Sequence, residues 1–278
     1  MLSQATETHR CYYHRSHMGK VQKEFKIAGQ LTFSSPESQV GFAREIQYKT
    51  ANGLRVKIKD HETEKDKLSI YIICDAESEQ EGRFLAEHEL QRLSELLSWE
   101  FNVPLSSPRI ISLEQIKIDG GKSSIVITNT VQITSSLAIR QAPGESRLQS
   151  TERMLENQLT EYHTMLLAMY QQAINTISIP LRFLLLFRIL EYINQPPGRE
   201  EKARILADTW IRKMETHVRI EKDITGKEVS IYTFLRDNVH PKPGNPEFPI
   251  QMYTDYLIVF QELVRKAIRD EFAIANTY

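Results

Sequence analysis

The hydrophobic positions in the first half of the chain recur with a period of two. Residues 25–33 place four large apolar side chains on one face, and residues 54–59 alternate strictly between apolar and basic side chains. Such alternation is typical of half-buried strands. The Asn-Gly pair at residues 52–53 is typical of a tight turn and predicts a hairpin between residues 45–49 and 54–59.

Further strands and one helix complete this first half. The run 68–74 predicts a central strand, and the runs 123–128 and 131–134 predict two more. Between them, residues 78–99 predict a helix whose apolar positions recur near a 3.6 spacing. The residues of that stripe are Phe84, Leu85, His88, Leu93, Leu96 and Leu97. The first half is therefore expected to be an α+β module, a mostly antiparallel β-sheet with a packed helix.

The second half follows the period of a helix. The predicted helices span residues 152–176, a segment that restarts at Leu181 after a proline, then 199–218, 231–239 and 252–272. Residues 183–190 are apolar nearly all round, which predicts the most buried helix of a bundle. The polar stretch 141–150 contains Pro and Gly and predicts the boundary between the two parts. The expected domains are residues 1–140, with a flexible start over the first 20, and an all-α domain over 151–278.

Composition narrows the class of protein. The 278 residues carry 35 Lys and Arg against 36 Asp and Glu, which argues against a globally basic protein that coats nucleic acid. The two cysteines, Cys11 and Cys74, cannot form a disulfide framework, so a reducing compartment is the simpler interpretation. The most apolar run, residues 179–193, is too short and too charged to span a bilayer. We therefore expect a cytoplasmic protein with no membrane partner.

The most informative local string is Leu235–Pro241, because it combines an arginine and a histidine. Arg236 and His240 are four positions apart and would project from one face of a helix, with Asp237 and Asn238 beside them. A guanidinium can hold a phosphate, and an imidazole can transfer a proton near neutral pH. Together they suit RNA cleavage in which the ribose 2′-hydroxyl attacks the adjacent phosphorus. The alternative is structural, since both side chains could simply stabilise a helix end.

The second half resembles a HEPN (higher eukaryotes and prokaryotes nucleotide-binding) domain of the kind found in ApeA-like and methylamine-utilisation-J-like prokaryotic proteins. The resemblance covers about residues 150–278 and is carried by the apolar helix Leu184–Tyr192 and by Leu235–Pro241. The first part, with its helix ending at residues 93–98, is similar to the strand-rich portion that often precedes such domains. The resemblance implies a helical bundle that forms a homodimer and acts as a metal-independent endoribonuclease in defence or stress.

The resemblance also assigns roles to residues. Arg236 would bind the scissile phosphate of RNA, Asp237 would fill the polar position of the motif, and His240 would transfer the proton; no metal and no cofactor is expected. Members of the family usually have four to six residues between the arginine and the histidine, whereas this chain has three. Each missing residue rotates the histidine by about 100° and shifts it by about 1.5 Å.

That departure keeps a second function open. Many members of the family are not catalytic, and residues 151–278 are nearly neutral, with 16 Lys and Arg against 17 Asp and Glu. The alternative is a sensor or adaptor whose helical domain dimerises and whose β-rich domain binds a protein partner, which could be encoded nearby. RNA-binding and nuclease function remain the first hypothesis.

Four other features of the sequence bear on function. Arg188 and Glu191 form an i, i+3 pair within the apolar helix; they could support the bundle or lie beside Arg236 as part of a substrate-binding site with Asn238. The basic face of Arg55, Lys57 and Lys59 could contact a phosphate backbone, although a solvated strand face is the simpler interpretation. The His and Cys residues of the first 17 positions match no zinc-binding spacing. The sequence also lacks the Walker A, GxGxxG, GxSxG and HExxH motifs.

Overall fold

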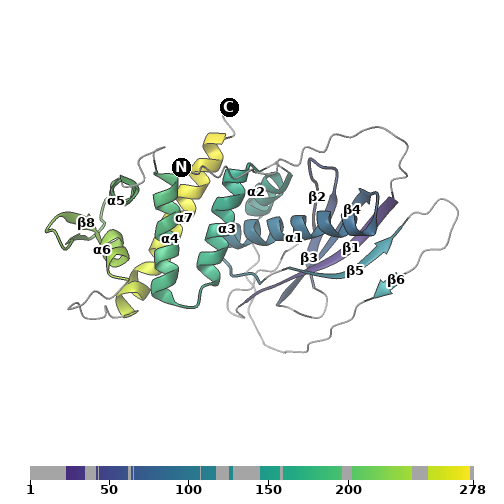
Figure 1. Cartoon of the computed structure of the whole chain (residues 1–278), viewed down its shortest axis with the longest axis horizontal. Coiled ribbons are helices and arrows are strands. Elements are labelled where there is room, and N and C mark those ends of the chain that lie inside the picture. Colours follow the sequence, from purple (N-terminus) through teal and green to yellow (C-terminus); the bar gives the residue numbers. More distant parts are fainter. Residues whose placement is uncertain are drawn as a thin grey trace, which may run out of the picture.

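A computed structural model describes most of the chain. The described residues are 23–34, 42, 44–61, 64, 66–106, 108–116, 125–127, 145–156, 159–195, 202–239 and 250–275. The predicted strand at 131–134 and the first 20 residues lie outside these ranges. The predicted class, α+β, is confirmed: a sheet lies at one end of the molecule and most of the helices lie towards the other (Figure 1).

The sheet is antiparallel and has the strand order β2-β3-β4-β1-β5-β6. Its strands are β1 (Lys23–Thr32), β2 (Ile46–Lys49), β3 (Arg55–Asp60), β4 (Lys67–Ala76), β5 (Arg109–Gln115) and β6 (Ile125–Ile127). The central pair, β1 and β4, is in register over ten residues, from Lys23 opposite Ala76 to Thr32 opposite Lys67. The predicted hairpin is β2 and β3, and the predicted central strand is β4. Strand β5 was not predicted.

Helix α1 (Glu79–Phe101) packs on one face of this sheet, against β1, β4 and β5. It begins after the N-cap Ser78, whose side chain accepts a hydrogen bond from the Glu81 N–H, and it ends at Asn102, which has a positive φ of 54°. The predicted inward stripe of this helix is partly wrong. Phe84 is 62% exposed and His88 is exposed, whereas Glu89 and Leu90 are buried. The second half of the stripe is as predicted, because Leu93, Leu96 and Leu97 are buried.

The remaining helices build the second part of the molecule. They are α2 (Glu145–Glu156), α3 (Glu161–Asn175), α4 (Ile179–Ile193), α5 (Ala203–Met214), α6 (Ile231–Asp237) and α7 (Ile250–Ala275), and a short hairpin of β7 (Ile220–Lys222) and β8 (Glu228–Ser230) lies between α5 and α6. As predicted, α4 is central: it packs against α3, α5, α6 and α7. No helix in the described part of the chain is long and apolar enough to cross a membrane.

The start of this part differs from the expected elements. The stretch 141–150, predicted as the boundary, contains the first residues of α2, which packs against β2, and Oε1 of Glu152 lies 2.6 Å from Nη1 of Arg44. The single helix predicted over 152–176 is two helices, because Thr160 caps the start of α3 by accepting a hydrogen bond from the His163 N–H.

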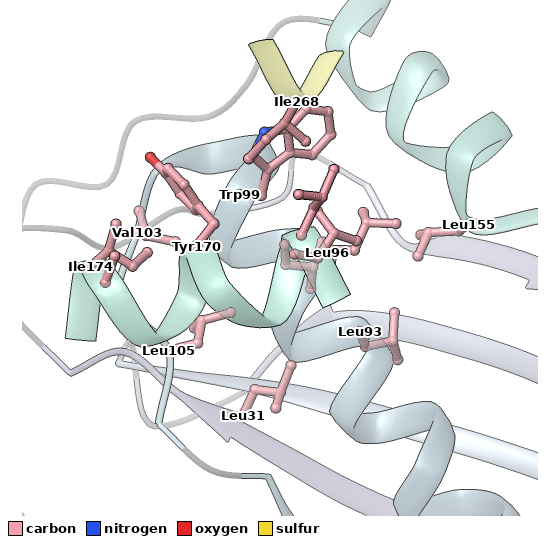
Figure 2. Packing of buried hydrophobic residues seen from close by; sticks show 14 of the residues in the cluster. Leu31, Leu93, Leu96, Trp99, Val103, Leu105, Leu155, Tyr170, Ile174 and Ile268 are labelled. Carbon is pink, nitrogen blue, oxygen red and sulfur yellow. The ribbon is translucent and has the colours of Figure 1, made fainter. Parts of the chain in front are cut away.

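The buried side chains of both parts form one continuous cluster (Figure 2). Trp99 of α1 lies beside Ile268 of α7 and near Tyr170 of α3. Arg265 of α7 reinforces the contact by donating to the carbonyl oxygens of Trp99 and Glu100 at 3.0 and 2.7 Å. The division into two domains stays a prediction, but the two parts share a core and hold each other in place.

Candidate functional site

The short helix α6 is held firmly by a buried carboxylate. Ser230 is its N-cap, and Asp208 of α5 accepts hydrogen bonds from the Ser230 N–H, the Ser230 hydroxyl and the Thr233 hydroxyl at 2.8, 2.7 and 2.6 Å. At the other end, the hydroxyl of Tyr253 donates to the Leu235 carbonyl at 3.1 Å. These contacts fix the last turn of α6, which carries Arg236 and Asp237.

Arg236 reaches from α6 to the central helix α4. Its Nη2 donates to Oε1 of Glu191 at 2.7 Å, and its Nη1 donates to Oδ1 of Asp237 at 3.0 Å. The guanidinium also lies over the ring of Phe187, 5.8 Å from the ring centroid. Its buried Nε has no hydrogen-bond partner within the described ranges. The arginine is thus oriented by two carboxylates and one aromatic ring, with N–H groups left over.

Glu191 joins two arginines. Only 5% of this residue is exposed, and its second oxygen accepts from Nη1 of Arg188 at 3.0 Å. The Arg188 side chain itself is 63% exposed. Glu191 therefore anchors one half-buried guanidinium and one solvent-facing guanidinium at the same end of α4.

Asp237 is shared in the same way. It accepts from Arg236 and also from Arg204 of α5, whose Nε lies 3.0 Å from both carboxylate oxygens. The hydrogen bond that Arg204 donates to Asp237 raises the pKa of Arg204 above its ordinary value, against the opposing effect of burial. Arg204 also reaches Asp223 in the β7–β8 turn at 3.5 Å. Hydrogen bonding from Thr225 holds the pKa of Asp223 below its ordinary value, so this carboxylate stays charged.

These side chains surround a pocket of about 640 Å³, which we call the arginine pocket. Its lining residues come from α4, α5, α6 and the β7–β8 hairpin, and these helices lie towards the end of the molecule opposite the sheet (Figure 1). Its lining residues are Leu184, Arg188, Arg204, Asp223, Ile224, Thr225, Arg236 and Asp237. Three guanidinium groups and two carboxylates line it, so its own side chains carry a small positive excess. Glu191 does not line the pocket, but it accepts hydrogen bonds from Arg188 and Arg236.

The structure brings together four of the residues singled out from the sequence: Arg188, Glu191, Arg236 and Asp237. Asn238 has a different place, because its Nδ2 donates to the Phe234 carbonyl at 2.7 Å and the residue does not line the pocket. His240 lies outside the described residues.

Sequence reasoning missed Arg204 and Asp223. Arg204 sits at the start of an ordinary amphipathic helix, and Asp223 sits in a polar turn, so neither pattern differs from that of a surface charge. Only the three-dimensional position of the β7–β8 hairpin next to α6 joins them to Asp237.

A guanidinium is a planar donor that matches the oxygens of a phosphate group. The arginine pocket offers three of them around one space, which suits a phosphate or phosphodiester ligand. No group of three or more His, Cys, Asp and Glu side chains within the described ranges could hold a metal ion. The His and Cys residues of the first 17 positions are outside those ranges.

Comparison of the chain with models of known families, with curated proteins and with solved structures gives no match.

Proposed function

We propose that the arginine pocket binds a phosphodiester of RNA and that the protein is a HEPN-like, metal-independent endoribonuclease that acts in defence or stress. The observation that supports this proposal most is that Arg236 and Arg188 both donate hydrogen bonds to the same carboxylate, Glu191. Arg188 and Arg236, both singled out from the sequence, come from α4 and α6 and line one pocket. A guanidinium pair that a buried carboxylate holds in place is preorganised for an anion.

The proposed chemistry uses the residues of the chain in separate roles. Arg236 binds a non-bridging oxygen of the scissile phosphate, and Arg188 neutralises the charge that develops there. His240 removes the proton of the 2′-hydroxyl, whose oxygen then bonds to phosphorus. The bond from phosphorus to the 5′ oxygen breaks, which gives a 2′,3′-cyclic phosphate and, after proton transfer, a 5′-hydroxyl. Glu191 and Asp237 act by orienting Arg236.

A cleavage assay tests the proposal. Purified protein and a labelled single-stranded RNA are incubated with EDTA, and the products are separated by electrophoresis. We expect Arg236→Ala and His240→Ala to abolish cleavage, and Arg236→Lys to keep a small part of it, because an ammonium carries the charge without the planar fork. Arg212→Ala is the matched control, since Arg212 is a 43% exposed arginine of α5 whose only described ion pair, with Asp208, spans 4.0 Å.

Folding must be measured in the same samples. Circular dichroism and thermal melting separate a folded, inactive variant from an unfolded one. Intact RNA with folded wild-type protein, under every activating condition tried, would remove the nuclease proposal.

One observation favours the non-catalytic alternative, a sensor or adaptor. Both terminal nitrogens of Arg236 are already bound to carboxylates, and Arg204 is bound to Asp237 and Asp223. In the non-catalytic alternative, the role of this network is to hold α4, α5 and α6 together. In that case Arg236→Ala and His240→Ala would leave the binding of a protein partner unchanged. Neither the wild-type protein nor any variant would cleave RNA.

The proposal includes a homodimer formed through the helical part. Analytical ultracentrifugation at micromolar protein concentration measures its mass directly. A species of twice the mass of one 32.3 kDa chain is expected, and a monomer at all concentrations would contradict it.

A further inference from the structure

The sheet carries a second pocket, far from the arginine pocket. It has a volume of about 700 Å³ and lies over β1, β2, β3 and β4. Its lining residues are Lys26, Gln47, Tyr48, Arg55, Val56, Lys57, Lys59, Tyr71 and Ile73. Four of these are cations and none is a carboxylate. We call this surface the basic sheet face.

Strand geometry explains why the cations gather here. The buried residues Val56 and Ile58 of β3 alternate with Arg55, Lys57 and Lys59, so the three basic side chains share one face. Strand β4 lies between β3 and β1 in the sheet, which brings Lys26 of β1 to the same side. The alternation that makes β3 half buried therefore also concentrates positive charge.

An aromatic ring lies among these cations. Tyr71 of β4 is opposite Lys57 of β3 on one side and opposite Ala28 of β1 on the other. The ammonium groups of Lys26 and Lys59 lie 6.0 and 5.5 Å from its ring centroid. These two lysines come from the strands on either side of β4. The Tyr71 ring therefore has one ammonium group on the β1 side and one on the β3 side.

Carboxylates lie at the border of this surface and not in its lining. Glu45 lies 2.5 Å from Lys57, and Glu24 forms an ion pair with Arg55. The Lys57–Glu45 pair is exposed on both sides, with 40% and 44% of its side chains accessible, and in the Arg55–Glu24 pair the arginine side chain is 56% accessible. Exposed ion pairs such as Lys57–Glu45 are weak, so an incoming polyanion can replace Glu45 at Lys57.

We infer that the basic sheet face binds single-stranded RNA, with a base on Tyr71 and the flanking phosphates on Lys26 and Lys59. Aromatic rings set in a positively charged sheet surface suit single strands, because every base has a face that can stack and the backbone is anionic. Lysine stems are flexible, so a base can displace the two ammonium groups from the ring towards the phosphates beside it. An acidic peptide would use the cations but would have no need of the ring. This inference does not depend on cleavage at the arginine pocket.

Fluorescence anisotropy with a 5′-labelled 12-nucleotide oligouridylate tests the inference. All proteins carry Arg236→Ala, so that the probe stays intact and the arginine pocket is disabled. We expect Tyr71→Ala to weaken binding about tenfold or more, and Tyr71→Phe to stay within about threefold, because phenylalanine keeps the stacking surface. The double variant Lys26→Ala, Lys59→Ala should reduce the magnitude of the slope of log K against log salt concentration by roughly 1.4, because each phosphate contact on a single strand contributes about 0.7 to that slope.

Two exposed lysines of the helical part, Lys213 and Lys266, provide a matched control for the loss of two charges. Their double alanine variant should bind the probe as the Arg236→Ala protein does. The inference would be overturned if the Arg236→Ala protein does not bind the probe, or if adding Tyr71→Ala leaves its affinity for the probe unchanged. It would also be overturned if polyglutamate binds as tightly as the RNA and Tyr71→Ala does not change that affinity. If the wild-type protein does not cleave RNA, the nuclease proposal is overturned, but the inference that the basic sheet face binds RNA is not affected.

Discussion

Replacing the buried carboxylate Glu191 by an amide, Glu191→Gln, is expected to destabilise the protein by about 2 kcal/mol. A hydrogen bond to a charged group contributes about 1.5–3 kcal/mol. The bond to Arg188 contributes little of this, because that side chain is 63% exposed and exposed pairs are worth about 0–1 kcal/mol. The 2.7 Å bond to Arg236, whose side chain is 26% exposed, carries most of the loss. The amide keeps an oxygen acceptor but removes the charge.

Urea unfolding followed by tryptophan fluorescence measures this difference, and thermal melting provides a second value. For a chain of this size, 2 kcal/mol corresponds to a fall in Tm of roughly 4–8 °C. Arg188→Ala is the control and should cost less than about 1 kcal/mol. A double-mutant cycle of Glu191→Gln with Arg236→Met should give a coupling energy above about 1 kcal/mol. Equal effects of Glu191→Gln and Arg188→Ala, or simple additivity in the cycle, would refute the view that Glu191 anchors Arg236.

Three further predictions concern other parts of the fold. Asp208→Ala should cost about 2–4 kcal/mol in urea unfolding, because it leaves the buried Ser230 N–H and hydroxyl without their shared acceptor; a cost below 1 kcal/mol would contradict the role given to this carboxylate. Gly29→Ala should cost about 1–3 kcal/mol, because the added Cβ would lie 2.7 Å from the side chain of Leu90 where α1 crosses β1; an unchanged Tm would show that α1 shifts freely. Burial raises the pKa of Cys74 to about 11, so its thiol should not react with a thiol reagent at pH 8 in a Cys11→Ser background. Its stabilising effect should be complete below the unfolded pKa near 9 and be lost as the pH rises to 11. Rapid labelling of the folded protein at pH 8 would contradict this pKa.

The sheet could be predicted from the sequence wherever burial is one-sided. Strands β1, β3 and β4 alternate because only one of their faces is buried, and that alternation is visible in the residue order. Strand β5 was missed because its burial does not alternate strictly: Ile110 and Ile111 are adjacent, and only Leu113 is buried. The β7–β8 strands have three residues each, which is too short for a period to show.

The helices show a similar limit. The division between α2 and α3 depends on Thr160, whose capping hydrogen bond to His163 interrupts a stripe that is otherwise continuous. In α5 the buried residues are Ala203, Ala207 and Ile211 together with Asp208. A buried aspartate does not look like a core residue until its partners Ser230 and Thr233, more than 20 residues later, are known to lie beside it.

Four residues of the candidate site could be predicted from the sequence, but Arg204 and Asp223 could not. Arg188 and Glu191 stood out as charges within an apolar helix, and Arg236 and Asp237 stood out in a local string. The three arginines and their carboxylates form one network only because α5 and the β7–β8 turn pack beside α6. Contacts of that kind depend on tertiary structure and leave no local signal in the chain.

The most direct test of the central claim is the chemistry of the RNA ends left by the wild-type protein in EDTA. The account predicts 2′,3′-cyclic phosphate and 5′-hydroxyl termini, no cleavage at a position with a single 2′-deoxy substitution, and no products with Arg236→Ala. Products that carry 5′-phosphate ends, or equal cleavage at the deoxy position, would contradict it.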